Sequence, residues 1–369
     1  MNAFFVFGAL SILLLHILGF FIEAQNEFAW NYDIEAILII LLRFSRAFFI
    51  FGTGMLLFYW YRHRDVDWSV FWRKRWVNII LPYLIWTGIY TYTRFQTTDP
   101  SVLVPEYLTS LISGSSFYHL YYIPLYLQVT VLFMLSKRVI EKYIRFRLVV
   151  LIGVLQMMLY GAYQHFFSAP VLNQIDWNAN MLLSLLKHSY VYNQLYVYMY
   201  LFYFLLGAFA GLHVDQWRIW VRRLAPFSWI ILGTTSFILI HRYLTGKMTY
   251  LEGLNIFTPL YMVYTLSLMI AFYPVMARLG RIPHIGTWLS RMAKHNMAIY
   301  MTHPLILFLL ESYVIYHVRF WSVPAIMASM FILTVPVSII LYNNTRISTL
   351  WVKARKKHQH QQQMQPYRA

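Results

Sequence analysis

Apolar residues in this chain come in blocks of about twenty, which is the length of an α-helix that crosses the ~30 Å hydrocarbon core of a bilayer. The helices of soluble domains instead carry their apolar residues as amphipathic stripes. With 60% hydrophobic and 12% charged residues, the composition also lies outside the range of soluble domains. The sequence therefore predicts an all-α polytopic membrane protein.

We predict about ten transmembrane helices in one membrane domain over residues 1–345, followed by a basic tail rich in Gln and His over residues 346–369. The composition of the tail predicts disorder rather than metal binding. The N-terminus lacks the positive region and the cleavage site of a signal peptide, so the first block is expected to stay as a span. The predicted spans are 3–22, 35–60, 76–93, 118–136, 147–164, 194–212, 226–241, 256–277, 296–316 and 322–342.

Most of the 30 basic residues lie in the tail and in the loops that follow every second predicted span. The positive-inside rule then places both termini in the cytoplasm. This topology accounts for the net charge of +17, so the charge predicts no nucleic-acid partner, and the lipid bilayer is the expected surrounding. Cysteine is absent, which excludes disulfides, thiolate metal ligands and a cysteine nucleophile.

Two arginines, Arg43 and Arg46, lie inside the second predicted span. A membrane-buried arginine costs at least a few kcal/mol and is usually functional, and a spacing of three residues predicts one shared helix face. His16 is the lone ionisable residue of the first predicted span. Helix rise places it roughly 9 Å below the outer surface, and the arginines roughly 12 and 17 Å below it. We therefore predict that these three side chains converge.

Histidine can take a proton from a hydroxyl group, which makes His16 the expected general base for acyl transfer to an alcohol. Arg43 and Arg46 would stabilise an oxyanion or hold the phosphates of a donor such as coenzyme A. A structural histidine that bonds a neighbouring helix is the alternative role for His16. The sequence contains no H-E-x-x-H, P-loop or G-x-S-x-G motif, and we expect no metal site.

Five segments occur in an order that resembles the membrane-bound acyltransferase-3 family: His16, Arg43–Arg46 with Phe51–Gly54, Phe71–Arg75 with Leu81–Tyr83, His119–Leu125, and Ala298–Pro304. The resemblance implies an enzyme that moves acyl groups from cytoplasmic donors onto extracytoplasmic glycans. It likens His16 to the catalytic histidine of the family. It also likens the helix bearing Arg43 and Arg46 to one that ends in a turn at Phe51–Gly54.

The resemblance further implies a bacterial plasma-membrane protein that uses acyl-CoA, with acetyl-CoA the expected donor, and holds no permanently bound cofactor. Its acceptor would be a polysaccharide or glycolipid, and glycan synthesis machinery is a further expected partner. Arg73 and Arg75 are expected to contact the donor phosphates, since Phe5 stands where the family usually has a basic residue. His119 and Tyr122 are expected to bind the acceptor, and a hydrogen bond at the external start of the fourth span is the alternative role for His119.

The residues Ile50–Thr53 most resemble the branch of the family that includes the intercellular-adhesin membrane protein. Members of that branch are described as O-acyltransferases or as exporters. The alternative function is therefore a polysaccharide exporter or flippase that performs no covalent step. A lone histidine at the depth of the arginines favours catalysis, which needs a base.

Two further features allow two interpretations each. The tyrosine-dense stretch Tyr190–Tyr200 is either an interfacial aromatic belt or a sugar-stacking surface. His303 is expected near the inner part of the ninth span, where it either bonds the backbone carbonyl that Pro304 leaves free or contributes to the site.

Overall fold

The computed structural model describes residues 2–23, 32–166, 192–317 and 323–345, with residues 181, 183, 184 and 187 between them. Every regular element in these residues is helical, which confirms the predicted all-α class for this part of the chain. The predicted tail, 346–369, and the first residues of the tyrosine-dense stretch lie outside the described residues. The boundary of the membrane domain at residue 345 stays a prediction.

Five described helices are long and apolar enough to cross a bilayer, namely α1 (Asn2–Glu23), α7 (Tyr122–Tyr143), α8 (Phe146–Phe166), α12 (Val214–Leu244) and α14 (Pro259–Leu279). Shorter apolar stretches lie in three more helices, α11 (Leu201–Leu212), α16 (Asn296–His317) and α17 (Val323–Thr345). The other predicted spans hold α2 (Tyr32–Leu42), α3 (Ser45–Tyr61) and α5 (Leu81–Phe95).

Helical elements also occupy segments that the sequence predicted as loops. They are α4 (Trp68–Arg75), α6 (Pro100–Ser113), α13 (Tyr250–Gly253) and α15 (Pro283–Lys294). The π-helical turn η1 (Trp76–Ile80) begins the predicted span 76–93, and the 3-10 turns η2 (Asn193–Leu195) and η3 (Val197–Tyr200) lie at the start of the predicted span 194–212. Helix α6 has clear local signals for its ends. The Asp99 side chain accepts a hydrogen bond from the Ser101 N–H at 2.9 Å, and Gly114 ends the helix with a φ of 68°.

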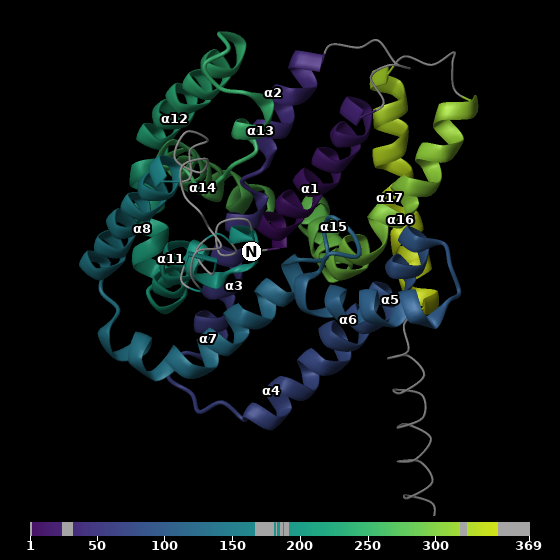
Figure 1. The fold of residues 1–369 in the computed structure, drawn as a ribbon. Helices are drawn as coiled ribbons and strands as arrows, with labels where there is room; N and C mark the ends of the chain where they lie inside the picture. The colour runs from purple at the N-terminus through teal and green to yellow at the C-terminus, as the bar shows by residue number, and fades with distance from the viewer. Residues whose placement is uncertain are drawn as a thin grey trace, which may run out of the picture.

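The helices form two groups with α1, α2 and α3 between them (Figure 1). Helices α8, α11, α12 and α14 pack together on one side, and α16 and α17 pack together on the other. Helix α1 contacts both groups, because it packs against α14 as well as against α15, α16 and α17. Helices α5 and α6 pack on each other, and α5 contacts α16. This arrangement places α1 and α3 beside the space that becomes the candidate site.

Helices α3 and α11 pack backbone to backbone through glycines. A Cβ atom added at Gly54 would lie 2.5 Å from the carbonyl oxygen of Phe204, and one at Gly207 would meet the carbonyl oxygen of Phe51. Small residues four apart, such as Gly207 and Gly211, are typical of close helix contacts in membranes.

The residues Phe51–Gly54 lie inside α3. The family resemblance implied that the helix ends in a turn at this position, and that prediction is wrong.

The second predicted span is not one continuous helix. Helix α2 ends at Leu42, Arg43 and Phe44 form a turn, and α3 begins at Ser45. The prediction that Arg43 and Arg46 share one face of one helix is therefore wrong. Instead, Arg43 lies in the break and Arg46 lies in the first turn of α3.

Hydroxyl groups satisfy the backbone carbonyl groups that the break exposes. An interrupted helix at membrane depth needs such partners, because hydrocarbon offers none. Three hydroxyl groups, two of them from α14, donate to the last carbonyls of α2 at 2.7, 2.8 and 2.9 Å, in the pairs Tyr261–Ile40, Tyr264–Leu41 and Ser45–Leu42. Because the tyrosines are more than 200 residues away in sequence, pattern analysis of the span could not predict the break.

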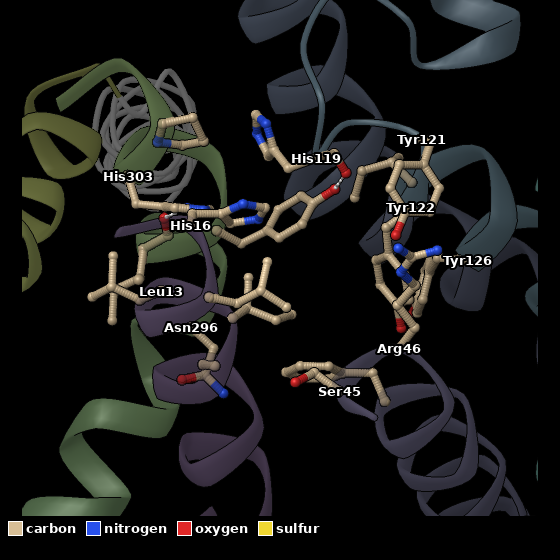
Figure 2. Close-up of a pocket in the computed structure, with 18 of the residues that line it drawn as sticks. Leu13, His16, Ser45, Arg46, His119, Tyr121, Tyr122, Tyr126, Asn296 and His303 are labelled. Atoms are coloured by element: carbon tan, nitrogen blue, oxygen red, sulfur yellow. Dashed lines mark hydrogen bonds between the residues drawn. The ribbon is translucent and has the colours of Figure 1, made fainter. Parts of the chain in front are cut away.

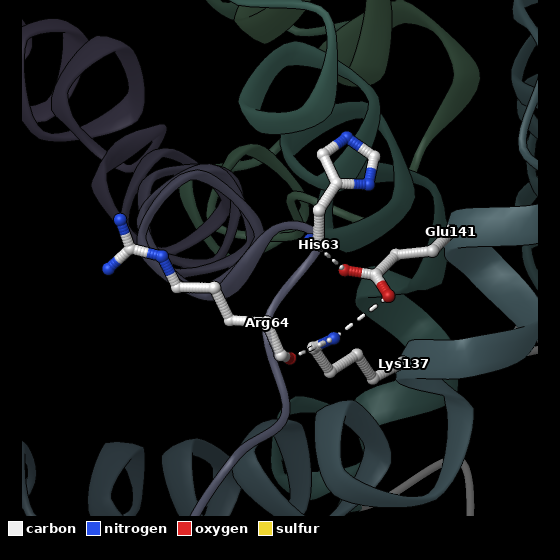
Figure 3. A network of polar contacts seen from close by, with 4 residues as sticks. All are labelled: His63, Arg64, Lys137 and Glu141. Carbon is white, nitrogen blue, oxygen red and sulfur yellow. Dashed lines mark hydrogen bonds and ion pairs between the residues drawn. The ribbon is translucent and has the colours of Figure 1, made fainter.

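A compact polar network fixes the loop between α3 and α4 to α7 (Figure 3). Lys137 pairs with Glu141 at 2.8 Å, and these side chains are only 8% and 16% exposed. Lys137 also donates to the carbonyl oxygen of Arg64 at 3.0 Å, while Glu141 accepts from the backbone N–H of His63 at 3.3 Å. The network holds the chain just before α4, the helix that carries Arg73 and Arg75.

Candidate active site

A cavity of about 1180 Å³ lies between α1, α3, α16 and the segment that leads into α7. Its wall follows α3 from Ser45 to Tyr61, a length of roughly 24 Å at the rise of an α-helix. This length is comparable to most of the thickness of a bilayer core. Six of the seven predicted site residues line it, namely His16, Arg43, Arg46, Arg75, His119 and Tyr122.

The two arginines form one wall of this cavity together with tyrosines. The Arg43 guanidinium donates to the carbonyl oxygen of Leu254 at 2.8 Å. The Arg46 guanidinium donates to the Gln194 side chain at 3.1 Å, and its carbon lies 5.2 Å from the centre of the Tyr121 ring. Figure 2 shows Arg46 beside Tyr121, Tyr122 and Tyr126, across the cavity from the histidines.

This arginine wall is strongly electropositive. Within the described ranges, neither Arg43 nor Arg46 forms an ion pair with a carboxylate; the ion pairs found there are Lys137–Glu141 and Arg218–Asp215. The N-terminus of α3, the positive end of its dipole, lies at the same place. Burying charge without a counter-charge costs several kcal/mol, so this wall favours an anionic ligand or a reacting group that becomes negative.

Three histidines form the opposite wall. The ring of His303 lies between the other two, with its centre 5.4 Å from that of His16 and 5.4 Å from that of His119 (Figure 2). The hydroxyl of Tyr300, one helical turn before His303, donates to the carbonyl oxygen of His119 at 2.6 Å. This bond ties α16 to the segment that carries His119.

The adjacency of His16 and His303 corrects the depth predicted from the sequence. Straight helices would place His16 in the outer half and His303 near the inner part of its span, yet their ring centres are only 5.4 Å apart. The estimate assumed spans with known ends that run straight along the bilayer normal. Tilt and uncertain ends can shift a side chain by several ångströms in depth. The histidines therefore share one level of the cavity.

Pro304 lies inside helix α16, and the preceding residue, His303, contacts the backbone of the same helix. The Nδ1 atom of His303 lies 2.7 Å from the carbonyl oxygen of Ile299. The carbonyl freed by Pro304 is that of Tyr300, one residue further on. His303 therefore bonds a backbone carbonyl, but that of Ile299 rather than the one that Pro304 leaves free, and its Nε2 atom has no partner among the described residues. His303 combines a structural contact with a free polar atom, and it lines the cavity.

The two arginines predicted to hold the donor phosphates have different positions. Arg75 lines the cavity and stacks over the Phe71 ring at 3.3 Å, with its Nη1 donating to the Phe71 carbonyl oxygen at 3.2 Å. Arg73 is exposed on α4 and is not part of the cavity wall. Only Arg75 is placed to contact a ligand inside the cavity.

In the described segments, no group of three or more His, Cys, Asp or Glu side chains is arranged to hold a metal ion. The sequence also missed several lining residues, including Tyr118, whose ring centre lies 4.4 Å from that of His16. Another is Asn296, whose buried Oδ1 atom lacks a partner. A single polar residue at the start of an apolar helix gives no signal that distinguishes a ligand contact from a helix end.

The fold combines helices long and apolar enough to cross a membrane with a cavity that has histidines on one wall and arginines on another. Residues 6–343 match the family acyltransferase 3, described as an acyltransferase domain. The chain therefore belongs to the acyltransferase-3 family and is a membrane acyltransferase. The comparisons with curated proteins and with solved structures gave no match. The finer likeness to the intercellular-adhesin branch stays a prediction.

Proposed function

We propose that this protein transfers an acyl group, with acetyl the expected one, from a cytoplasmic acyl-CoA to a hydroxyl group of an extracytoplasmic polysaccharide or glycolipid. The proposal includes about ten spans, cytoplasmic termini and a location in a bacterial plasma membrane, where glycan synthesis machinery would supply the acceptor. The observation that carries it is the cavity in which His16 lies across from Arg46 (Figure 2), with Arg43 also in its lining. A base and a cationic wall are the two groups that acyl transfer to an alcohol requires.

In the proposed reaction, His16 takes the proton from the acceptor hydroxyl while its oxygen attacks the thioester carbonyl carbon. The C–O bond forms as the carbonyl becomes an oxyanion, which Arg46, Arg43 and the N-terminus of α3 stabilise. Collapse of this intermediate breaks the C–S bond. The departing thiolate takes the proton from His16, so the products are an ester and free coenzyme A.

The length of the cavity supports the meeting of two substrates from opposite sides. Arg75 lines the cavity together with Tyr61, at the C-terminal end of α3, and the charge pattern predicts that this end faces the cytoplasm. Its guanidinium would bind the phosphates of acyl-CoA. Gln194 and Tyr250 line the cavity together with Arg46 at the other end, where the acceptor would enter. His119 and Tyr122 lie between these ends and would contact the acceptor.

The alternative exporter function has less support. A transporter without a covalent step does not require a base in contact with its substrate, and membership of an acyltransferase family favours an enzyme. The histidine wall is therefore the feature that separates the two functions.

The proposal predicts that His16→Ala abolishes acyl transfer without unfolding the protein. Purified protein in nanodiscs is incubated with radiolabelled acetyl-CoA and candidate glycans, and the labelled ester is counted. Loss of a general base lowers the rate by about 10²–10⁴-fold. His165→Ala, at the exposed end of α8, is the matched control and retains activity. Unchanged transfer by His16→Ala would refute the role of His16, and glycan secretion without any acylation would favour the exporter.

A further inference from the structure

Three ring nitrogens on the histidine wall have no hydrogen-bond partner among the residues that the structure describes. They are Nε2 of His303 and both Nδ1 and Nε2 of His119. The two residues are only 1% and 3% exposed, and both line the cavity. Each buried polar atom left unpaired costs about 1–3 kcal/mol, and native proteins contain few of them. Three such atoms within one part of a cavity indicate that a ligand supplies their partners.

The hydrogen bond of His303 fixes what this ligand must offer. Its Nδ1 atom lies 2.7 Å from the carbonyl oxygen of Ile299, and a carbonyl oxygen can only accept. Nδ1 must therefore carry the proton. In a neutral imidazole the other nitrogen, Nε2, is then an acceptor with a free lone pair. The partner of His303 has to be a hydrogen-bond donor.

This requirement excludes several groups of the two substrates. The thioester carbonyl and an ionised phosphate or carboxylate only accept hydrogen bonds, so they cannot satisfy Nε2 of His303. His119, as a neutral imidazole, needs both a donor and an acceptor for its two nitrogens. A hydroxyl group is the simplest partner for both residues, because it donates one hydrogen and accepts through its oxygen.

One hydroxyl cannot serve both His16 and His303. In the proposed reaction the acceptor hydroxyl gives its only hydrogen to His16, so it has none left for Nε2 of His303. The rings of His16 and His303 are nevertheless only 5.4 Å apart between centres. A second hydroxyl close to the first, on the neighbouring carbon, would supply the missing donor.

We propose that the acceptor of this enzyme carries a 1,2-diol, of which His16 deprotonates one hydroxyl while Nε2 of His303 accepts a hydrogen bond from the other. The oxygen of this second hydroxyl accepts from the N–H of His119, so the diol pairs two of the three nitrogens and leaves the acceptor nitrogen of His119 to another donor of the ligand. His303 is thereby a specificity-determining residue that selects acceptors with adjacent hydroxyl groups. The inference rests on the proposed function, since it needs an alcohol as acceptor.

Methyl β-D-glucopyranoside is the probe for this inference, with acetyl-CoA as donor and the full-length protein in nanodiscs. The acetylated position is first determined by NMR spectroscopy of the product. The probe is then compared with two analogues changed at the neighbouring hydroxyl. The deoxy sugar lacks the oxygen, and the O-methyl ether keeps the oxygen but lacks the hydrogen. If His303 needs a hydrogen-bond donor, both analogues should show the same decrease in kcat/KM, by about 10- to 100-fold relative to the probe.

Two variants of His303 separate recognition from structure. In His303→Asn the side-chain amide reaches the position of Nδ1 but offers no acceptor at the position of Nε2. The ratio of kcat/KM for the diol to kcat/KM for its analogues should therefore fall to about 1. In His303→Gln the longer side chain carries an acceptor to the position of Nε2, which should restore part of the preference. Thermal unfolding of each variant shows whether the fold is intact.

The outcomes distinguish this inference from the proposed function. Equal rates of the wild type with the diol and both analogues would overturn the diol inference and leave the acyltransferase intact. Acetylation confined to the 6-hydroxyl, whose neighbouring carbon bears no hydroxyl, would also overturn it. A His303→Asn enzyme that is slower with all acceptors but keeps its preference would show a purely structural role. No transfer by the wild type to any sugar in the panel would count against the proposed function itself.

Discussion

The contact between α3 and α11 gives a sharp prediction, because its close backbone packing helps to position the helix that carries Arg46. In Gly54→Ala the new Cβ atom would lie 2.5 Å from the carbonyl oxygen of Phe204 and 3.3 Å from the backbone nitrogen of Ala208. Ordinary contacts begin near 3.4 Å, so the two helices must separate by about 1 Å at this point. Overpacking of this kind costs about 1–3 kcal/mol, and the gain in helix propensity of about 1 kcal/mol offsets part of it.

The expected result is a moderate loss of stability and a larger loss of activity. A displacement of about 1 Å at a catalytic group can lower the rate by about 10²-fold, and Arg46 lies on the same helix, two turns from Gly54. Acyl transfer and thermal unfolding are measured for Gly54→Ala beside Gly233→Ala. The control adds the same methyl group to helix α12, where nothing lies within 4 Å. Equal activity of the two variants would refute the claim that close α3–α11 packing positions the arginine wall.

Three further predictions concern charged groups outside the histidine wall. Arg75→Gln raises the KM for acyl-CoA about tenfold because it removes a charged hydrogen bond, whereas Arg73→Gln, outside the cavity, leaves it unchanged. Lys137→Met lowers the free energy of unfolding by about 1–3 kcal/mol because Glu141 loses its cation, and thermal melts of the double variant with Glu141→Leu should recover part of this loss. The hydrogen bond from the backbone N–H of Ser101 lowers the pKa of Asp99. At pH values above the pKa that Asp99 has in the unfolded chain, its carboxylate therefore stabilises the start of α6. This stabilisation is lost as the pH falls through the lower pKa of Asp99 in the folded protein. Hydrogen exchange should therefore be faster in Asp99→Ala at neutral pH and equal to the wild type in strong acid; a difference that persists in acid would contradict the capping role.

The sequence was sufficient to predict the class of protein and to single out residues that line one cavity. Apolar blocks of membrane length follow directly from the order of residues, and helices occupy each of the predicted spans in whole or in part. His16, Arg43 and Arg46 stand out because charge in an apolar block is costly wherever the block folds. Their placement around one cavity agrees with the predicted convergence.

The predictions that failed depended on distances between helices. The break at Arg43 is stabilised by hydroxyl groups of Tyr261 and Tyr264, which reach it only when α14 packs beside α2. The adjacency of His303 to His16 depends on how α1 and α16 cross. Rise per residue gives depth along one ideal helix, but it contains no information on tilt or on neighbours.

The sequence by itself determined that this chain forms long apolar helices and carries one histidine and two arginines within its apolar segments. These properties are local, because hydrophobicity and charge belong to each residue regardless of its partners. The tertiary structure alone decided that the cations lie at a broken helix, that Arg75 rather than Arg73 enters the cavity, and that a third histidine joins the site. Those features arise from contacts between residues far apart in the chain, and the energies of such contacts depend on packing geometry.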